Sequence, residues 1–160
     1  MTRFEVRTHI AAQPEQVFKA SLSVEAHTES MGKTAERAVG GVTYGHMTLN
    51  DQVTWRARHF GVYWHMTSTI SACEPPSFFV DEQVKGPFRR WRHEHYFADD
   101  GNGGTTMHDI VAFTAPAGVL GRIAERLILK RYMTKLIETR NQYLKHTTEA
   151  AFNAQSPRSS

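Results

Sequence analysis

The chain has 160 residues, of which 40% are hydrophobic and 22% are charged, with a formal net charge of +3 at pH 7. These values are typical of one globular domain that buries about two thirds of its unfolded surface. The basic residues form no long run, since Arg89–Arg92 is interrupted by an aromatic residue. We therefore expect no nucleic-acid partner.

Cysteine usage and the first residues indicate a compartment. Cys73 is the single cysteine, which excludes an intramolecular disulfide and fits a reducing environment. The stretch Met1–Ile10 has no apolar run long enough for a secretory signal, and no segment approaches the length of a membrane span. We expect a cytoplasmic protein without integral membrane association.

The chain begins with a strand and two short helices. From Phe4 to Ile10, apolar or small residues alternate with charged or polar ones, a period typical of a half-buried strand. A helix is expected next, because Pro14 is tolerated in a first helical turn and Glu15 is favourable at the positive end. The polar stretch Ser23–Met31 predicts a second short helix.

Six further strands are predicted in the middle of the chain. Gly, Pro, Asn and Asp residues separate them at short intervals, most clearly in the turn Asp100–Gly104. Such spacing predicts an antiparallel meander. The expected strands are Glu36–Gly41, Asp51–Val62, Tyr63–Glu74, Phe78–Lys85, Trp91–Ala98 and Thr105–Phe113.

The stretch Ala117–Lys145 is helical in pattern, but its apolar stripe changes side at Ile128–Leu129. One straight helix lying on one core would keep its stripe. We therefore expect Leu129–Lys145 to grip the core and Gly118–Ile128 to face elsewhere. The segment Gly118–Ile128 could close a cavity, or its face Leu120–Ile128 could dock a partner or a second copy of the chain.

A wholly buried helix is the alternative for this region, and the charged residues Arg122, Glu125 and Arg126 argue against it. After about His146 there is little to bury, which predicts a disordered tail. The expected organisation is one domain over 1–146 and a tail over 147–160. Strand, helices, meander and terminal helix together predict an α+β fold, an antiparallel sheet with one face covered by the last helix.

Several stretches carry a resemblance to a known family: Asp51–Gly61, Phe79–Glu82, Gly86–Phe88, His93–His95 and Pro116–Gly121. They resemble bacterial proteins described as polyketide cyclases/dehydrases, of the START-like (SRPBCC) superfamily. The resemblance covers the chain to about Lys145. It implies a helix-grip fold, with a curved antiparallel sheet of about seven strands, two short N-terminal helices and a long C-terminal helix over the sheet. Because the superfamily contains carriers, ligand sensors, cyclases and dehydratases, the resemblance implies no single activity.

The residues best suited to chemistry lie on two consecutive predicted strands. His93 and His95 share one face of Trp91–Ala98, and Asp109 shares a face with large apolar residues of Thr105–Phe113. We expect both faces to point inward, where a buried polar group needs a partner or a ligand. Either the aspartate orients a histidine that acts as a general base or hydrogen-bond donor, or the three residues form a satisfied network without chemistry.

Two other features leave alternatives. His93 and His95 could bind a metal with His59 and Asp109 as completing ligands, but no second close pair of ligands supports this. No metal and no cofactor are therefore expected.

Arg56 and Arg58 share one face of their strand, and the sequence does not decide which face it is. On the solvent side they would pair with Asp81 or Glu82 at little gain. On the inner side, a guanidinium would anchor a carboxylate.

The expected function is binding of a small hydrophobic ligand, aromatic, polyketide-like or lipid-like, between the sheet and the last helix. One alternative is a cyclase or dehydratase with a cavity histidine as general acid or base. Another is an interaction module that docks a partner through residues 118–128. The expected ligand contacts are Trp55, His59, Trp64, Trp91, His93, His95, Asp109, Met133 and Leu136.

Overall fold

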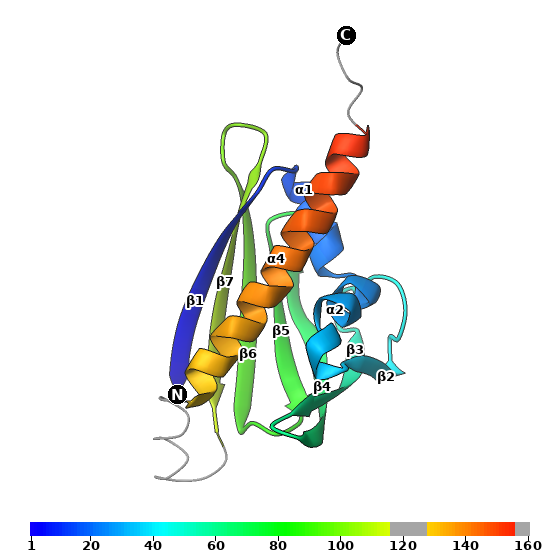
Figure 1. Ribbon diagram of the computed structural model, residues 1–160, viewed down its shortest axis with the longest axis vertical. Helices are drawn as coiled ribbons and strands as arrows, with labels where there is room; N and C mark the ends of the chain where they lie inside the picture. Colours follow the sequence, from blue (N-terminus) through cyan, green and yellow to red (C-terminus); the bar gives the residue numbers. More distant parts are fainter. Residues whose placement is uncertain (116–127, 156–160) are drawn as a thin grey trace.

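The computed structural model of the protein describes residues 1–115 and 128–155. Seven strands form one antiparallel sheet in the order β1-β7-β6-β5-β4-β3-β2 (Figure 1). The predicted antiparallel meander is confirmed. The strands are β1 Thr2–Ile10, β2 Arg37–Gly41, β3 Gln52–His59, β4 Val62–Glu74, β5 Phe78–Lys85, β6 Arg90–Asp99 and β7 Thr105–Thr114.

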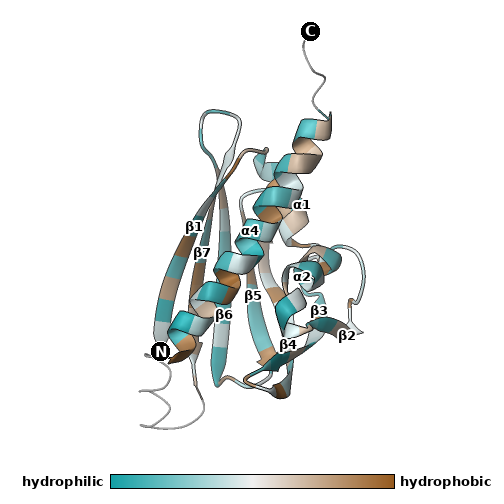
Figure 2. Cartoon of the chain, in the orientation of Figure 1, coloured by the Kyte–Doolittle hydropathy of each residue, from teal (hydrophilic) through white to brown (hydrophobic). Residues whose placement is uncertain are grey.

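The strands bury one face because their sequences alternate. Every second residue of β7 is buried, from Thr105 to Phe113, and β1 shows alternating hydrophobic and hydrophilic bands (Figure 2). In β6 the buried residues include His93 and His95. The inward face predicted for both histidines and for Asp109 is therefore confirmed.

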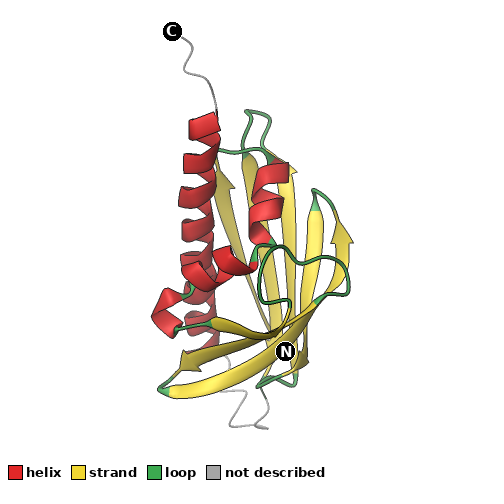
Figure 3. Ribbon diagram, turned by 90° about the vertical axis from the view of Figure 1, so that its right-hand side faces the viewer, coloured by secondary structure: helices red, strands yellow, loops and turns green. Residues whose placement is uncertain are grey.

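The helices lie together on one side of the curved sheet (Figure 3). They are α1 Pro14–Ser21, α2 Val24–Ser30, the 3₁₀ turn η1 Gly32–Thr34 and α4 Lys130–Gln155. Pro14 occupies the first turn of α1 as predicted, and Ser23 Oγ caps α2 by accepting a hydrogen bond of 3.2 Å from the Ala26 amide. The α+β helix-grip architecture is confirmed.

Helix α4 is longer than the sequence pattern predicts. The prediction of a disordered tail from residue 147 is wrong for residues 147–155, which belong to this helix. Thr148 is buried, and Phe152 packs against the main apolar core. Glu149 Oε1 accepts a hydrogen bond of 2.8 Å from the Ala11 amide. These contacts are with residues far away in the sequence, such as Ala11, so the local pattern gave no sign of them.

Three predictions concern Gly118–Ile128: the change of side of the apolar stripe, the gate, and the docking face Leu120–Ile128. Apart from Ile128, this segment lies outside the described residues. The Ile128 side chain is 59% exposed. These features stay predictions, as do the cytoplasmic location and the absence of a nucleic-acid partner. Among the described residues, no helix is long and apolar enough to cross a membrane.

Candidate functional site

A cavity of about 350 Å³ lies between the inner face of the sheet, the α1–α2 region and the first half of α4. Small-molecule sites begin at about this size. Its wall is predominantly apolar, and all three tryptophans of the chain line it. Every residue predicted as a ligand contact lines this cavity except Asp109.

Asp109 instead lies directly behind the two histidines. Its side chain is fully buried, and its Oδ1 atom is 2.9 Å from His93 Nε2 and 2.9 Å from His95 Nδ1. The first contact is a hydrogen bond, whereas the orientation of the second does not make one. Asn141 Nδ2 donates to Asp109 Oδ2 at 2.7 Å. Asp109 thus holds the His93 imidazole and lies against that of His95 without lining the cavity itself.

Asp81 belongs to this cluster, which sequence reasoning missed. It pairs directly opposite His93 in the β5–β6 register, and it lines the cavity with Phe79, two residues earlier on the same face. Asp81 Oδ2 is 3.0 Å from His95 Nε2 and 3.6 Å from His93 Nδ1. In the sequence, the one available signal is that Asp81 shares a strand face with Phe79. Only the register with His93 shows that Asp81 joins the cluster.

Arg56 and Arg58 do not form the surface ion pairs with Asp81 or Glu82 that the sequence allowed. Arg56 and Arg58 are both exposed, which settles the face left open by the sequence and excludes an inward carboxylate anchor. The Arg56 guanidinium lies 4.0 Å from the centre of the Tyr63 ring. Glu82 pairs with Arg92 instead, at 2.9 Å.

Arg140 is the second missed residue, a buried cation on α4 that also lines the cavity. Its Nη2 donates to the Ser21 carbonyl oxygen at 3.2 Å, and its Nη1 lies 3.9 Å from Asp109 Oδ1. The available signal was helical spacing, because Arg140 follows the buried Ile137 by three positions and therefore shares its side of the helix.

Burial and mutual charge set the protonation of the cluster. Burial, with a further contribution from the neighbouring His95, lowers the pKa of His93 to about 4 against the pull of Asp109. Burial alone would raise the pKa of Asp109, but the hydrogen bond from His93 and the close contact with His95 hold it well below its usual value. The pKa of Asp81 is lowered in the same way. At neutral pH, both carboxylates are ionised and His93 is neutral.

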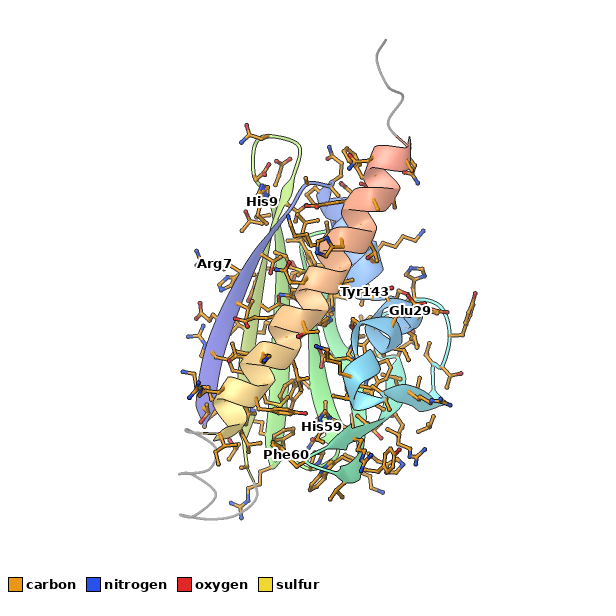
Figure 4. The ribbon with its side chains drawn as sticks, viewed as in Figure 1. Arg7, His9, Glu29, His59, Phe60 and Tyr143 are labelled. Atoms are coloured by element: carbon orange, nitrogen blue, oxygen red, sulfur yellow. The ribbon has the colours of Figure 1, made fainter. Side chains whose placement is uncertain are left out.

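The cavity is bordered at one end by the β3–β4 hairpin and the start of α4. His59 Nδ1 is 2.8 Å from the Tyr132 hydroxyl, and the Phe60 and Tyr132 rings lie 4.7 Å apart. Figure 4 shows His59 and Phe60 together at this hairpin, at the end of the sheet near the first turn of α4. Burial lowers the pKa of His59. At this end of the cavity, His59 pairs with Tyr132.

The described residues bring three candidate metal ligands together. Asp81, His93 and His95 each offer one ligand atom, and these atoms lie within 4.8 Å of one another. This set differs from the one weighed in the sequence, because Asp81 takes the place considered for His59 and Asp109.

The chain matches a family model described as "Polyketide cyclase / dehydrase and lipid transport" over residues 1–149. No curated protein matches it. Among solved structures it is similar to TTHA0849 from Thermus thermophilus, with a TM-score of 0.76, 16% identity, and coverage of 94% of this chain and 99% of that one.

A second similar structure is the Zhui aromatase/cyclase from Streptomyces sp. R1128, with a TM-score of 0.71 and 12% identity, covering 92% of this chain and 93% of that one. A third is Ara h 8.0201, with a TM-score of 0.58 and 14% identity, covering 89% and 97%. At these identities the similarity shows a shared fold. The family match over nearly the whole chain shows more: this protein belongs to the polyketide cyclase / dehydrase and lipid transport family.

Proposed function

We propose that the protein binds a small hydrophobic ligand, ring-bearing or lipid-like, in the cavity between the sheet and α4. The observation that carries this proposal is how the side chains are distributed over the cavity wall. Apolar and aromatic side chains cover most of it, and a polar cluster is formed by Asp81, His93, His95 and Arg140. Ligand sites combine a large apolar surface with a few convergent polar groups in this manner. The family description, which includes lipid transport, agrees with it.

The apolar wall would supply most of the affinity. A ligand that buries about 200 Å² of apolar surface gains about 5 kcal/mol before the cost of immobilisation. Aromatic faces from Trp55, Trp64 and Trp91 line this wall, and they favour a ligand that carries rings.

The polar cluster would orient the ligand. The two ionised carboxylates of the cluster, Asp81 and Asp109, outnumber its one guanidinium, Arg140. Such a cluster accepts a hydrogen bond from a hydroxyl or phenol and repels a carboxylate. The proposed ligand is therefore an apolar molecule with a neutral hydroxyl or phenol at one end.

Energy transfer from tryptophan to N-phenyl-1-naphthylamine tests this binding. We expect saturable binding of one molecule per chain. Ser68→Phe should abolish it, because Ser68 is buried and lines the cavity. The matched control, Ser71→Phe, adds the same ring to an exposed position of the same strand and should bind normally. Equal binding by the two variants, both shown to be folded by circular dichroism, would contradict the cavity as the binding site.

A second candidate function is acid–base chemistry on the bound ligand, as in a cyclase or dehydratase. The observation that favours it is the hydrogen bond of 2.9 Å between His93 and the buried Asp109, with His93 on the cavity wall. The lowered pKa of His93, about 4, makes it a weak base and places this function second.

Deuterium exchange into the methyl group of 2-acetylnaphthalene, followed by NMR, measures proton removal next to a carbonyl. This second function would be supported if the wild-type protein catalyses the exchange and His93→Gln lowers the rate to that of buffer. A wild-type rate equal to that of buffer would argue against it.

A further inference from the structure

We propose that Asp81, His93 and His95 form a binding site for a divalent transition-metal ion on the inner wall of the cavity, with Asp109 orienting both imidazoles. The proposal does not depend on the identity, or the binding, of an organic ligand.

The strand register places the three side chains in one patch. His93 and His95 are two residues apart on the buried face of β6, and Asp81 of β5 is directly opposite His93. The Asp81 Oδ2 atom is 3.0 Å from His95 Nε2 and 3.6 Å from His93 Nδ1. Ligand atoms about 2.1 Å from one metal ion lie about 3.0 to 3.4 Å from each other in octahedral or tetrahedral geometry. The two distances to Asp81 are close to this range, and all three ligand atoms lie within 4.8 Å of one another.

Asp109 occupies the position of a supporting carboxylate. His93 Nε2 and His95 Nδ1, the ring nitrogens turned away from Asp81, each lie 2.9 Å from Asp109 Oδ1. Metal-bound histidines commonly present their second nitrogen to a carboxylate, which fixes the tautomer and the ring orientation. The hydrogen bond to Asp109 places the His93 proton on Nε2 and leaves the Nδ1 lone pair directed toward Asp81. Without a metal, His95 Nε2 is hydrogen-bonded to Asp81, so metal binding would require the His95 proton to be on Nδ1, beside Asp109.

The two contacts of His95 favour a cation at this place. A neutral imidazole carries one N–H, yet both its nitrogens face carboxylates, at 3.0 Å from Asp81 and 2.9 Å from Asp109. Either tautomer therefore places a lone pair against a carboxylate oxygen. A metal ion between His95 Nε2 and Asp81 would relieve this repulsion. The ring centre of His93 is only 3.7 Å from that of His95, so His93 would also contribute to binding the metal.

The donor set and the charge decide the kind of ion. Two imidazoles and one carboxylate suit Zn²⁺, Fe²⁺, Co²⁺ or Mn²⁺ rather than Ca²⁺. The charges of Asp81 and Asp109 favour a dication, and the opposing Arg140 is held by the Ser21 carbonyl oxygen, with Nη1 3.9 Å from Asp109. Three protein ligands leave coordination positions open. Since Asp81, His93 and His95 line the cavity, these positions face it, where a bound ion would polarise an oxygen of a ligand.

Co²⁺ titration of the tag-free protein, after chelator treatment and dialysis, tests the site through visible d–d absorption and calorimetric stoichiometry. We expect one Co²⁺ per chain. Asp81→Asn and His95→Gln should each weaken binding by more than about 100-fold, since even an outer-shell partner commonly contributes 10- to 100-fold.

Matched controls make the same chemical changes on the outer face of the sheet. Glu82→Gln alters the neighbouring residue of β5, which pairs with Arg92, and His108→Gln alters an outward histidine of β7, which pairs with Glu5. Both should bind Co²⁺ like the wild type. Absence of stoichiometric binding by the wild-type protein would overturn the proposal whatever the variants do. Unchanged affinity in Asp81→Asn or His95→Gln, with circular dichroism showing a folded protein, would also overturn it.

Discussion

Asp109 shows how a buried carboxylate is kept ionised in an apolar interior. Its oxygens face His93, His95 and Asn141, and the side chain is inaccessible to solvent. A buried charge is tolerated only where such partners replace water. The removal of one partner should therefore cost more than an ordinary surface hydrogen bond.

Asn141→Leu is expected to lower the free energy of unfolding by about 1–3 kcal/mol, because Asp109 Oδ2 loses its donor at 2.7 Å while it stays buried. Urea unfolding measures the change. Asn153→Leu makes the same substitution at an exposed position of the same helix, and we expect it to change stability by less than about 0.5 kcal/mol. Similar stabilities of the two variants would contradict the role assigned to Asn141.

At the scale of single residues, the sequence predicted only part of the cluster. Strand alternation was enough to place His93, His95 and Asp109 inside. Asp81 and Arg140 could not be assigned in this way, because their positions depend on the β5–β6 register and on the rotation of α4 about its axis. Neither quantity is visible in a local pattern.

Among the elements, the strands were predictable and the end of α4 was not. Alternation and turn residues are local signals, and they located all seven strands. The last turns of α4 are held instead by contacts with the other end of the chain, including the bond from the Ala11 amide to Glu149 and the bond from Lys145 Nζ to Glu149 at 2.7 Å.

Glu149→Gln should remove a pH-dependent part of this anchoring. The Ala11 amide, and then Lys145, lower the pKa of Glu149 below its ordinary value of 4.5. A carboxylate with a lowered pKa stabilises the folded state above that ordinary value and loses its contribution as the pH falls through the folded-state pKa. The free energy of unfolding of the wild type should therefore exceed that of Glu149→Gln by about 1 kcal/mol at pH 7.

This difference should shrink below about pH 4.5. Thermal unfolding between pH 3 and pH 7 measures it, and Glu138→Gln, an exposed position of the same helix, serves as the control. A difference between wild type and Glu149→Gln that stays constant over this range would contradict the account of the helix end.

Two glycines with similar backbone angles should respond differently to alanine. Gly41 in β2 has φ of +70°, and an added Cβ would collide with the Gln52 carbonyl oxygen of β3. Gly61, between β3 and β4, has φ of +79° and open space around it. Gly61→Ala should cost about 1 kcal/mol from backbone strain alone, and Gly41→Ala clearly more. Urea unfolding distinguishes them, and equal losses would show that strand β2 yields freely to the added methyl group.

The whole molecule places a long helix across a curved sheet (Figures 1 and 3). The cavity and its polar cluster lie between them. The general form of this arrangement was predictable, because the order of elements and the family resemblance both led to it. The existence and contents of the cavity required the structure. Side-chain volumes around a space cannot be summed before the register and the helix position are known.

The most direct measurement is ¹⁹F NMR of the protein labelled with 5-fluorotryptophan, with each resonance assigned by a single Trp→Phe variant. The three tryptophans report on different parts of the wall, since Trp55 and Trp91 are 8% and 6% exposed whereas Trp64 is 43% exposed. If the cavity is the binding site, one equivalent of N-phenyl-1-naphthylamine should shift the resonances of Trp55 and Trp91 as well as that of Trp64. A shift confined to Trp64, or no shift at all, would contradict binding between the sheet and α4.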